Sequence, residues 1–281
     1  MNQSVDAYSP LESRHREFSF GGISNRRIAG ALICCALLAL IVPFDENISR
    51  FANGLARRWW LLDRIIEFLA SNELVKGGVV LTVYFLVWFG TGEPVSSIEP
   101  TNKRQTLLYT LLLCVPGLVF TRAIAWVLPF RARPILDPDL SLTVGYGFEP
   151  DSLWHWSCFP SDHAALFFAL ATGMFLADRK CGILLYAHTV LVVVLPRLFL
   201  GMHYLSDILV GALFGIALSY SVKWPALRTF TLSPALRLLK ASPGLFYAGF
   251  FLLCHETGEV YHHLMTAARG AWQVLIHISF N

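Results

Sequence analysis

The sequence carries few charged residues for its length. Only 15% of its 281 residues are charged, whereas a soluble domain carries about 25%. By contrast, 55% are hydrophobic, and the mean hydropathy is +0.55. The charged residues cluster, so long uncharged runs remain, which indicates an integral membrane protein rather than a soluble domain. The formal net charge of +3 is too small to indicate a nucleic-acid partner.

The sequence also lacks the common signatures of a bound metal or nucleotide. Its six cysteines show neither the CxxC spacing of a metal site nor a disulfide framework. Most of them lie in apolar runs, where cysteine packs as a small hydrophobic residue. No cluster of carboxylates for magnesium and no glycine-rich P-loop is present in the sequence.

Six apolar runs account for most of the chain. They have about 14–17 residues each, at the short end of the range that spans a bilayer, and neighbouring residues would complete the spans. The runs are 28–44, 77–92, 105–121, 164–177, 181–196 and 208–222. We therefore predict an all-α integral membrane protein built as a bundle of six transmembrane helices.

Basic residues favour one orientation of this bundle. Arg26 and Arg27 precede the first run, which favours a cytoplasmic N-terminus. Residues 122–162 and 197–207 then fall on the outer face, although the first outer loop also carries basic residues. The short loops assigned to the cytoplasm are basic, as the positive-inside rule expects. They hold Lys103, Arg104, Arg179, Lys180 and Lys223.

An amphipathic stretch, 45–73, lies between the first two runs. Apolar residues such as Trp59 and Ile65 alternate with charged residues such as Arg58 and Asp63. We predict an interfacial helix that lies along the bilayer surface, and a soluble cap helix is an equally weighted alternative. The predicted domains are a flexible N-terminal tail, 1–22, a six-helix membrane domain, 23–225, and a membrane-associated C-terminal tail, 226–281.

The stretch from Pro196 to Asp207 places ionisable residues between two apolar runs. Such groups are costly inside membrane sequence and mark candidate functional sites. His203 and Asp207 are four residues apart, so on a helix they share a face. There the carboxylate can bond one imidazole nitrogen and leave the other free as a base or nucleophile. Arg197 lies upstream and keeps its positive charge.

Two further polar clusters fall on the same predicted face. One is Arg131-Ala132-Arg133-Pro134, and the other is Phe159-Pro160-Ser161-Asp162-His163. Ser161 is a suitable N-cap for the helix that follows, and a helix N-terminus offers free N–H groups to an anion. Arginine forks bind phosphate oxygens two at a time. Together with two histidines, these groups predict a pocket that transfers a phosphoryl group.

The order and spacing of the three clusters resemble the type 2 phosphatidic acid phosphatase family, in its bacterial membrane branch. The family pattern is Lys-x6-Arg-Pro, then Pro-Ser-Gly-His, then Ser-Arg-x5-His-x3-Asp. This chain departs from it at three positions, where Trp126 replaces the lysine, Asp162 the glycine and Pro196 the serine. Either Arg122 or Arg131 could supply the missing charge. A Pro-Ser-Asp-His form also resembles the branch that acts on polyprenyl diphosphates.

The resemblance implies catalytic roles for three residues. His203 would be the nucleophile that forms a phosphohistidine, and Asp207 would orient and polarise it. His163 would protonate the leaving oxygen and then activate water. The family needs no metal, so we expect neither a metal nor another cofactor.

Four residues are candidates for phosphate binding. The resemblance implies this role for Arg133, Arg197 and Ser161, and we add Arg131 because it neighbours Arg133. The pocket would open at the outer face of a bacterial plasma membrane, where a lipid phosphate keeps its tail in the bilayer. Trp154 lies just before the second cluster, and aromatic residues favour that depth.

Four functions compete for this arrangement. The first is a phosphatase acting on polyprenyl diphosphate, phosphatidate or phosphatidylglycerol phosphate, with membrane lipids as its surroundings and no nucleic-acid partner. The second is a phosphotransferase that passes the phosphoryl group to another lipid or sugar. The third is a channel or transporter, for which broken helices and a site at mid-membrane would be typical. The fourth is a related scaffold that has lost activity through the change at Trp126.

Overall fold

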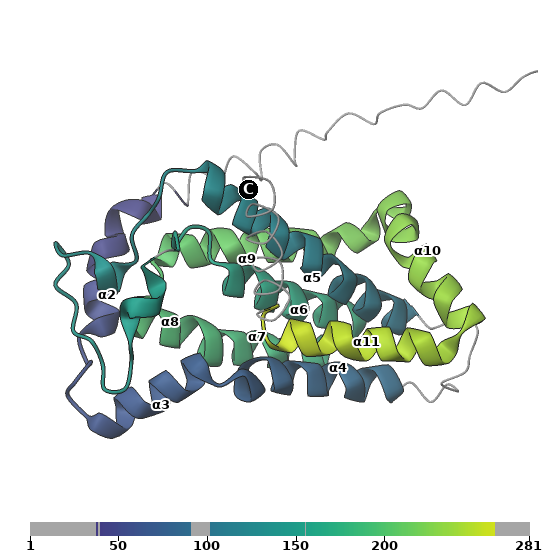
Figure 1. Ribbon diagram of the computed structural model, residues 1–281, viewed down its shortest axis with the longest axis horizontal. Helices are drawn as coiled ribbons and strands as arrows, with labels where there is room; N and C mark the ends of the chain where they lie inside the picture. The colour runs from purple at the N-terminus through teal and green to yellow at the C-terminus, as the bar shows by residue number, and fades with distance from the viewer. Residues whose placement is uncertain (1–37, 39, 91–101, 155, 262–281) are drawn as a thin grey trace, which may run out of the picture. The chain divides into compact units, whose positions relative to one another are not determined.

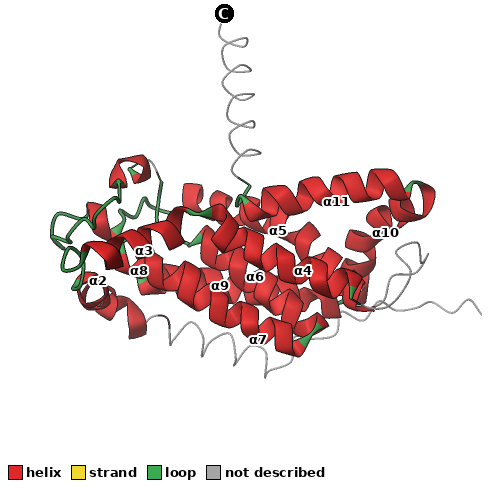
Figure 2. Ribbon diagram, turned by 90° about the horizontal axis from the view of Figure 1, so that it is seen from below, coloured by secondary structure: helices red, strands yellow, loops and turns green. Residues whose placement is uncertain are grey.

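A computed structural model of the protein describes residues 38, 40–90, 102–154 and 156–261. Within these residues the regular structure is entirely helical (Figure 2), so the predicted all-α class is confirmed. Most of the first apolar run, 28–44, lies outside the described residues, as do the predicted N-terminal tail and residues 262–281 of the predicted C-terminal tail.

Ten α-helices and two π-helical turns organise the described residues. The π-helical turns are Leu74–Gly78, between α3 and α4, and Thr189–Val194, between α7 and α8. The α-helices are α2 (Asp45–Asn53), α3 (Trp60–Ser71), α4 (Val79–Phe89), α5 (Asn102–Val127), α6 (Asp162–Ala177), α7 (Arg179–His188), α8 (Leu195–Phe199), α9 (Leu205–Tyr220), α10 (Pro225–Ala241) and α11 (Pro243–Gly258).

Three helical stretches of the described chain are long and apolar enough to cross a membrane: Asn102–Val127, Arg179–Phe199 and Leu205–Lys223. The bent pair α3 and α4, with 67° between its halves, makes a fourth if it counts as one span. The apolar helix α6 is shorter, at 16 residues. Membrane-spanning helices are thus confirmed, whereas the number of six spans stays a prediction.

Helix α6 lies at the centre of the helices that surround the site, packed between α5 and α9 (Figure 1). Its contact with α9 is close because two glycines face it. A Cβ atom at Gly211 would lie 2.3 Å from the Ser161 carbonyl oxygen, and one at Gly215 would lie 2.1 Å from that of Ala165. The backbone N–H of Ser161 also donates to the carbonyl of Asp207, at 3.2 Å. The second and third sequence clusters therefore meet where α6 and α9 begin.

The amphipathic stretch 45–73 forms two helices, α2 and α3, and not the single helix expected from the sequence. Extended backbone at Trp59 precedes α3. The apolar side chains of Trp60, Leu61 and Ile65 are exposed on α3, while Asp63 is buried and accepts the backbone N–H of Tyr146 at 2.9 Å. One side of α3 thus holds the loop that contains Tyr146, and the other presents apolar surface.

Helices α10 and α11 belong to the same packed unit as the membrane helices. Leu232, Leu239, Phe246 and Phe250 lie in the hydrophobic core that α4, α5 and α6 share. Trp88 of α4 packs against Phe250, with ring centroids 4.8 Å apart. The part of the predicted C-terminal tail that the structure describes is therefore packed on the bundle, and the division into three domains stays a prediction.

Candidate active site

The third sequence cluster forms a turn between two helices. Helix α8 ends at Phe199, Gly201 turns the chain with a φ of +64°, and α9 begins at Leu205. A non-glycine side chain would be strained at Gly201. His203 precedes the N-cap residue of α9, so the prediction that His203 and Asp207 share a helix face is wrong. The reason is that Asp207 caps this helix itself, accepting the Tyr204 N–H at 2.9 Å.

His203 is buried, and its two ring nitrogens face different partners. Nδ1 lies 2.8 Å from the carbonyl oxygen of Cys158 and 3.9 Å from Asp207 Oδ2. Because a carbonyl can only accept, Nδ1 carries the hydrogen of the neutral ring and Nε2 keeps the lone pair. Burial lowers the pKa of His203 well below its usual range, and the charges of Arg133 and Arg197 lower it further. The ring is therefore neutral, with Nε2 available as a nucleophile.

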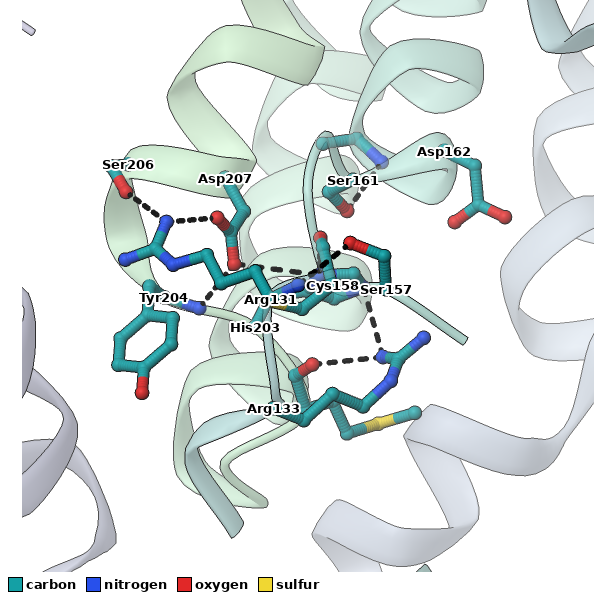
Figure 3. Close-up of polar contacts among 12 residues, drawn as sticks. Arg131, Arg133, Ser157, Cys158, Ser161, Asp162, His203, Tyr204, Ser206 and Asp207 are labelled. Atoms are coloured by element: carbon teal, nitrogen blue, oxygen red, sulfur yellow. Dashed lines mark hydrogen bonds and ion pairs between the residues drawn. The ribbon is translucent and has the colours of Figure 1, made fainter. Parts of the chain in front are cut away.

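Arg133 lies at the other edge of the same ring. Its Nη1 donates to the Met202 carbonyl at 2.8 Å and lies 3.4 Å from His203 Nε2. Figure 3 shows the guanidinium of Arg133 beside His203. The side chain is almost fully buried, so its positive charge acts directly on any group that approaches Nε2.

The second sequence cluster supplies the other histidine. Ser161 caps α6, and its Oγ accepts the Ala164 N–H, as expected from the sequence. His163 Nδ1 lies 2.9 Å from Asp162 Oδ1, which leaves Nε2 for proton transfer. The other oxygen of Asp162 forms an ion pair with Arg122. Asp162, which replaces the glycine of the family pattern, is thus neutralised by an arginine.

These groups surround a cavity of about 270 Å³, which brings Arg133, His163 and His203 together. Arg122 and Asp162 complete its polar lining. The apolar part of the lining consists of Leu153, Trp156 and Met202. Of the other residues selected from the sequence, Ser161, Asp207, Arg197 and Arg131 do not line this cavity.

Three arginines near the cavity keep unused hydrogen-bond donors. The Nε atoms of Arg122, Arg133 and Arg197 are buried and have no partner among the described residues. Arg197 is 1% exposed, and its Nη1 donates to the Val193 carbonyl at 3.2 Å. Buried donors without acceptors are costly, and those of Arg122 and Arg133 are available to an anion that enters the cavity beside the two histidines.

Parts of this chain are similar to known proteins. Residues 105–229 match the model of the PAP2 superfamily. Over this segment the chain is similar to the PAP2 superfamily. It is 26% identical over 178 residues to the bacitracin transport permease protein BcrC of Bacillus licheniformis, covering 63% of this chain and 78% of BcrC. The chain is also similar to the crystal structure of a transmembrane PAP2-type phosphatidylglycerolphosphate phosphatase from Bacillus subtilis. The two align over 70% of this chain and 93% of the phosphatase, with 21% identity and a TM-score of 0.44.

One basic residue of α5, Arg122, reaches the cavity. Trp126, which occupies the lysine position of the PAP2 pattern, is 78% exposed and does not line the cavity. Arg122 lies one helical turn earlier, where it contacts Asp162 and packs over the Trp156 ring at 4.7 Å. Of the two arginines that could replace the lysine, the structure therefore brings Arg122, and not Arg131, to the cavity. Sequence spacing alone left this choice open.

Arg131 has a different set of partners within the PAP2 segment. Its Nη1 lies 2.5 Å from Asp207 Oδ1 and 3.0 Å from Ser206 Oγ (Figure 3), and its Nη2 lies 2.8 Å from Asp45 Oδ2. Burial acts to lower the pKa of Arg131, but the two carboxylates outweigh burial and raise it. The guanidinium is thus occupied by protein carboxylates on the Nδ1 side of His203 rather than by the cavity.

Proposed function

We propose that this chain is a membrane phosphatase that hydrolyses a phosphomonoester or diphosphate of a lipid through a phosphohistidine intermediate. The observation that carries the proposal is a cavity lined by two imidazoles and by Arg122 and Arg133, each with a buried Nε donor that has no partner among the described residues. A phosphoryl group has three equatorial oxygens that gain charge during transfer, and guanidinium donors stabilise that charge.

The reaction proceeds in two displacements. His203 Nε2 attacks phosphorus, the bond from phosphorus to the leaving oxygen breaks, and His163 gives that oxygen a proton. His163 then takes a proton from water as the water oxygen attacks phosphorus, the bond to Nε2 breaks and phosphate leaves. Arg122 and Arg133, which line the cavity, bind the phosphate oxygens in both steps, and buried Arg197 adds positive charge from outside the lining. Neither displacement uses a metal.

Two other residues support these steps from outside the cavity. Ser161 caps α6 and so fixes the start of the helix that carries His163. Asp207 lies 3.9 Å from Nδ1 of His203, where its charge favours the positive ring that forms when Nε2 binds phosphorus. In this proposal Ser161 positions groups instead of binding phosphate directly.

The lining of the cavity supports a lipid substrate. Leu153, Trp156 and Met202 form its apolar part, and the cavity lies where the apolar helices α5, α6 and α9 begin or end. A lipid can leave its tail in the bilayer and present its phosphate to this lining. Polyprenyl diphosphate, phosphatidate and phosphatidylglycerol phosphate all fit this description, with the site at the outer face of a bacterial plasma membrane.

Transport is a second candidate function, because the relative from Bacillus licheniformis is named as a transport permease. A transporter would place its substrate site near the middle of the bilayer. The arginines and histidines instead gather at the ends of α5, α6 and α8 and the start of α9. The geometry therefore favours hydrolysis.

Phosphate release from a panel of lipid phosphates, assayed on the protein in detergent with excess chelator, tests the proposal. We expect free phosphate from at least one lipid with wild-type protein, and none above background with His203→Ala. Equal size-exclusion profiles for the two proteins would show that the variant still folds. A strict metal requirement, or wild-type turnover by His203→Ala, would contradict the mechanism. Transfer of the phosphoryl group to a second lipid without free phosphate would instead indicate the phosphotransferase.

A further inference from the structure

A buried carboxylate outside the PAP2 match contacts Ser206 and Arg131, close to His203, from a separate part of the chain. Asp45 is the first residue of α2 and is 2% exposed. Its Oδ1 accepts the backbone N–H of Ser206 at 3.0 Å, and its Oδ2 contacts the Ser206 hydroxyl and Arg131 Nη2. Since Arg131 also contacts Asp207, one guanidinium bridges two buried carboxylates.

The bridge is held in a fixed position by its neighbours. The guanidinium of Arg131 lies over the Tyr204 ring, 4.1 Å from its centroid. Tyr204 donates its backbone N–H to Asp207 Oδ2 at 2.9 Å and its hydroxyl to Asp137 at 3.2 Å. Tyr204 follows His203 directly in the chain, so the contacts that hold Arg131 and Asp207 also fix the backbone of the nucleophile.

The charge of this group matters for the proposed intermediate. Two carboxylates and one guanidinium leave one net negative charge next to Nδ1 of His203. When Nε2 binds phosphorus, the ring becomes positive, and a nearby buried negative charge stabilises it. Without Asp45, the full charge of Arg131 would cancel that of Asp207, and the site would lose this stabilisation.

We propose that Asp45 is a positioning residue for His203: by sharing Arg131 with Asp207, it keeps one net negative charge behind the imidazole. The inference rests on the proposed phosphatase function. A purely structural role is the competing explanation, in which Asp45 only ties α2 to the start of α9. The two explanations differ in the activity they expect when the charges of both Asp45 and Arg131 are removed. The second removal restores one net negative charge beside His203, but it weakens the link between α2 and α9 further.

The test compares kcat, KM and the thermal midpoint Tm for Asp45→Asn, Arg131→Gln, and the double variant. Asparagine keeps the size of the side chain and an oxygen for Ser206 but removes the charge. We expect kcat to fall by about tenfold to 100-fold in Asp45→Asn, with KM unchanged, and to recover partly in the double variant. Glu46→Gln is the matched control, because Glu46 is next in α2 and its side chain is 63% exposed.

Three outcomes would overturn the inference. The first is a wild-type kcat in Asp45→Asn, and the second is a double variant that is no more active than Asp45→Asn. The third is a loss of kcat in Glu46→Gln as large as the loss in Asp45→Asn. Should Asp45→Asn not fold, Asp45→Glu replaces it: the charge remains, so kcat should stay within about threefold of wild type, and a loss of tenfold or more would contradict the charge role. Absence of phosphate release by wild-type protein would instead contradict the proposed function itself.

Discussion

At the scale of residues, the chemistry depends on which nitrogen of His203 carries the hydrogen. The sequence indicated Asp207 as the partner of the ring, from the four-residue spacing. The direct partner of Nδ1 is instead the backbone carbonyl of Cys158, at 2.8 Å. The Cys158 N–H in turn donates to the Arg131 carbonyl at 3.0 Å. A backbone acceptor leaves no mark on a sequence pattern, because every residue type can supply it.

The neutral state of buried His203 links pH to stability. Burial lowers the pKa of His203 in the folded protein, whereas the unfolded chain has a value near 6.5. Below about pH 6.5 the unfolded state therefore binds a proton that the folded state does not, and stability falls as the pH falls. We expect the Tm in detergent to drop more between pH 7 and pH 5 for wild type than for His203→Gln. Equal drops in the two proteins would contradict the buried neutral ring.

Arg122 gives a separate test of the anion site. Its side chain lines the cavity, contacts Asp162 and keeps an unused Nε donor. Loss of a hydrogen bond to a charged group costs about 1.5–3 kcal/mol, so Arg122→Gln should raise KM for the lipid phosphate by about tenfold to 100-fold. The KM of Arg122→Lys should lie between those of the wild type and Arg122→Gln, because lysine keeps the positive charge but lacks the two-pronged guanidinium.

The control for Arg122 is an arginine outside the cavity. Arg50 lies on α2 with its side chain about half exposed, and it does not line the cavity. Arg50→Gln should leave KM at the wild-type value. An unchanged KM in Arg122→Gln, or an equal rise in both variants, would show that Arg122 does not bind the substrate phosphate.

At the scale of elements, the site depends on how closely α6 approaches α9. Helix α6 carries His163, and α9 carries Asp207 and begins just after His203. Gly211 and Gly215 of α9 make the close contact with α6. The sequence predicted both helices and the N-cap Ser161, because hydropathy and capping are local. It did not predict the turn before α9, the break between α2 and α3, or the π-helical turns, which depend on packing between distant segments.

Gly215→Ala tests this close contact. A Cβ atom there would lie 2.1 Å from the Ala165 carbonyl oxygen, so the helices must separate. Overpacking of this kind costs about 1–3 kcal/mol, and we expect a lower Tm together with lower phosphatase activity.

The matched control for that variant is Gly249→Ala on α11. The space around a Cβ at Gly249 is empty to 4 Å, and alanine is the better helix former by about 1 kcal/mol. Its Tm should equal or exceed that of wild type. A fall in Tm for Gly249→Ala as large as that for Gly215→Ala would contradict a specific role for the contact between α6 and α9.

At the scale of the whole molecule, the site and the basic loops occupy opposite ends of the helices. Arg122, Asp162 and Leu205 mark the site end of α5, α6 and α9. At the other end Lys103 pairs with Asp178 at 3.1 Å. The overall helical class could be predicted from hydropathy, whereas the orientation inferred from lysine and arginine stays a prediction. The contact between Asp45 and Ser206 could not be predicted, because the two residues are 161 positions apart in the chain and no local pattern joins them.

The most direct test of the whole account is to identify the phosphorylated residue during turnover. The protein would be mixed with a lipid phosphate labelled on phosphorus, quenched rapidly under alkaline denaturing conditions that preserve phosphohistidine, and mapped by peptide. The account predicts label on His203 in the wild type and none in His203→Ala. Label on another residue, or phosphate release by His203→Ala at the wild-type rate, would contradict it.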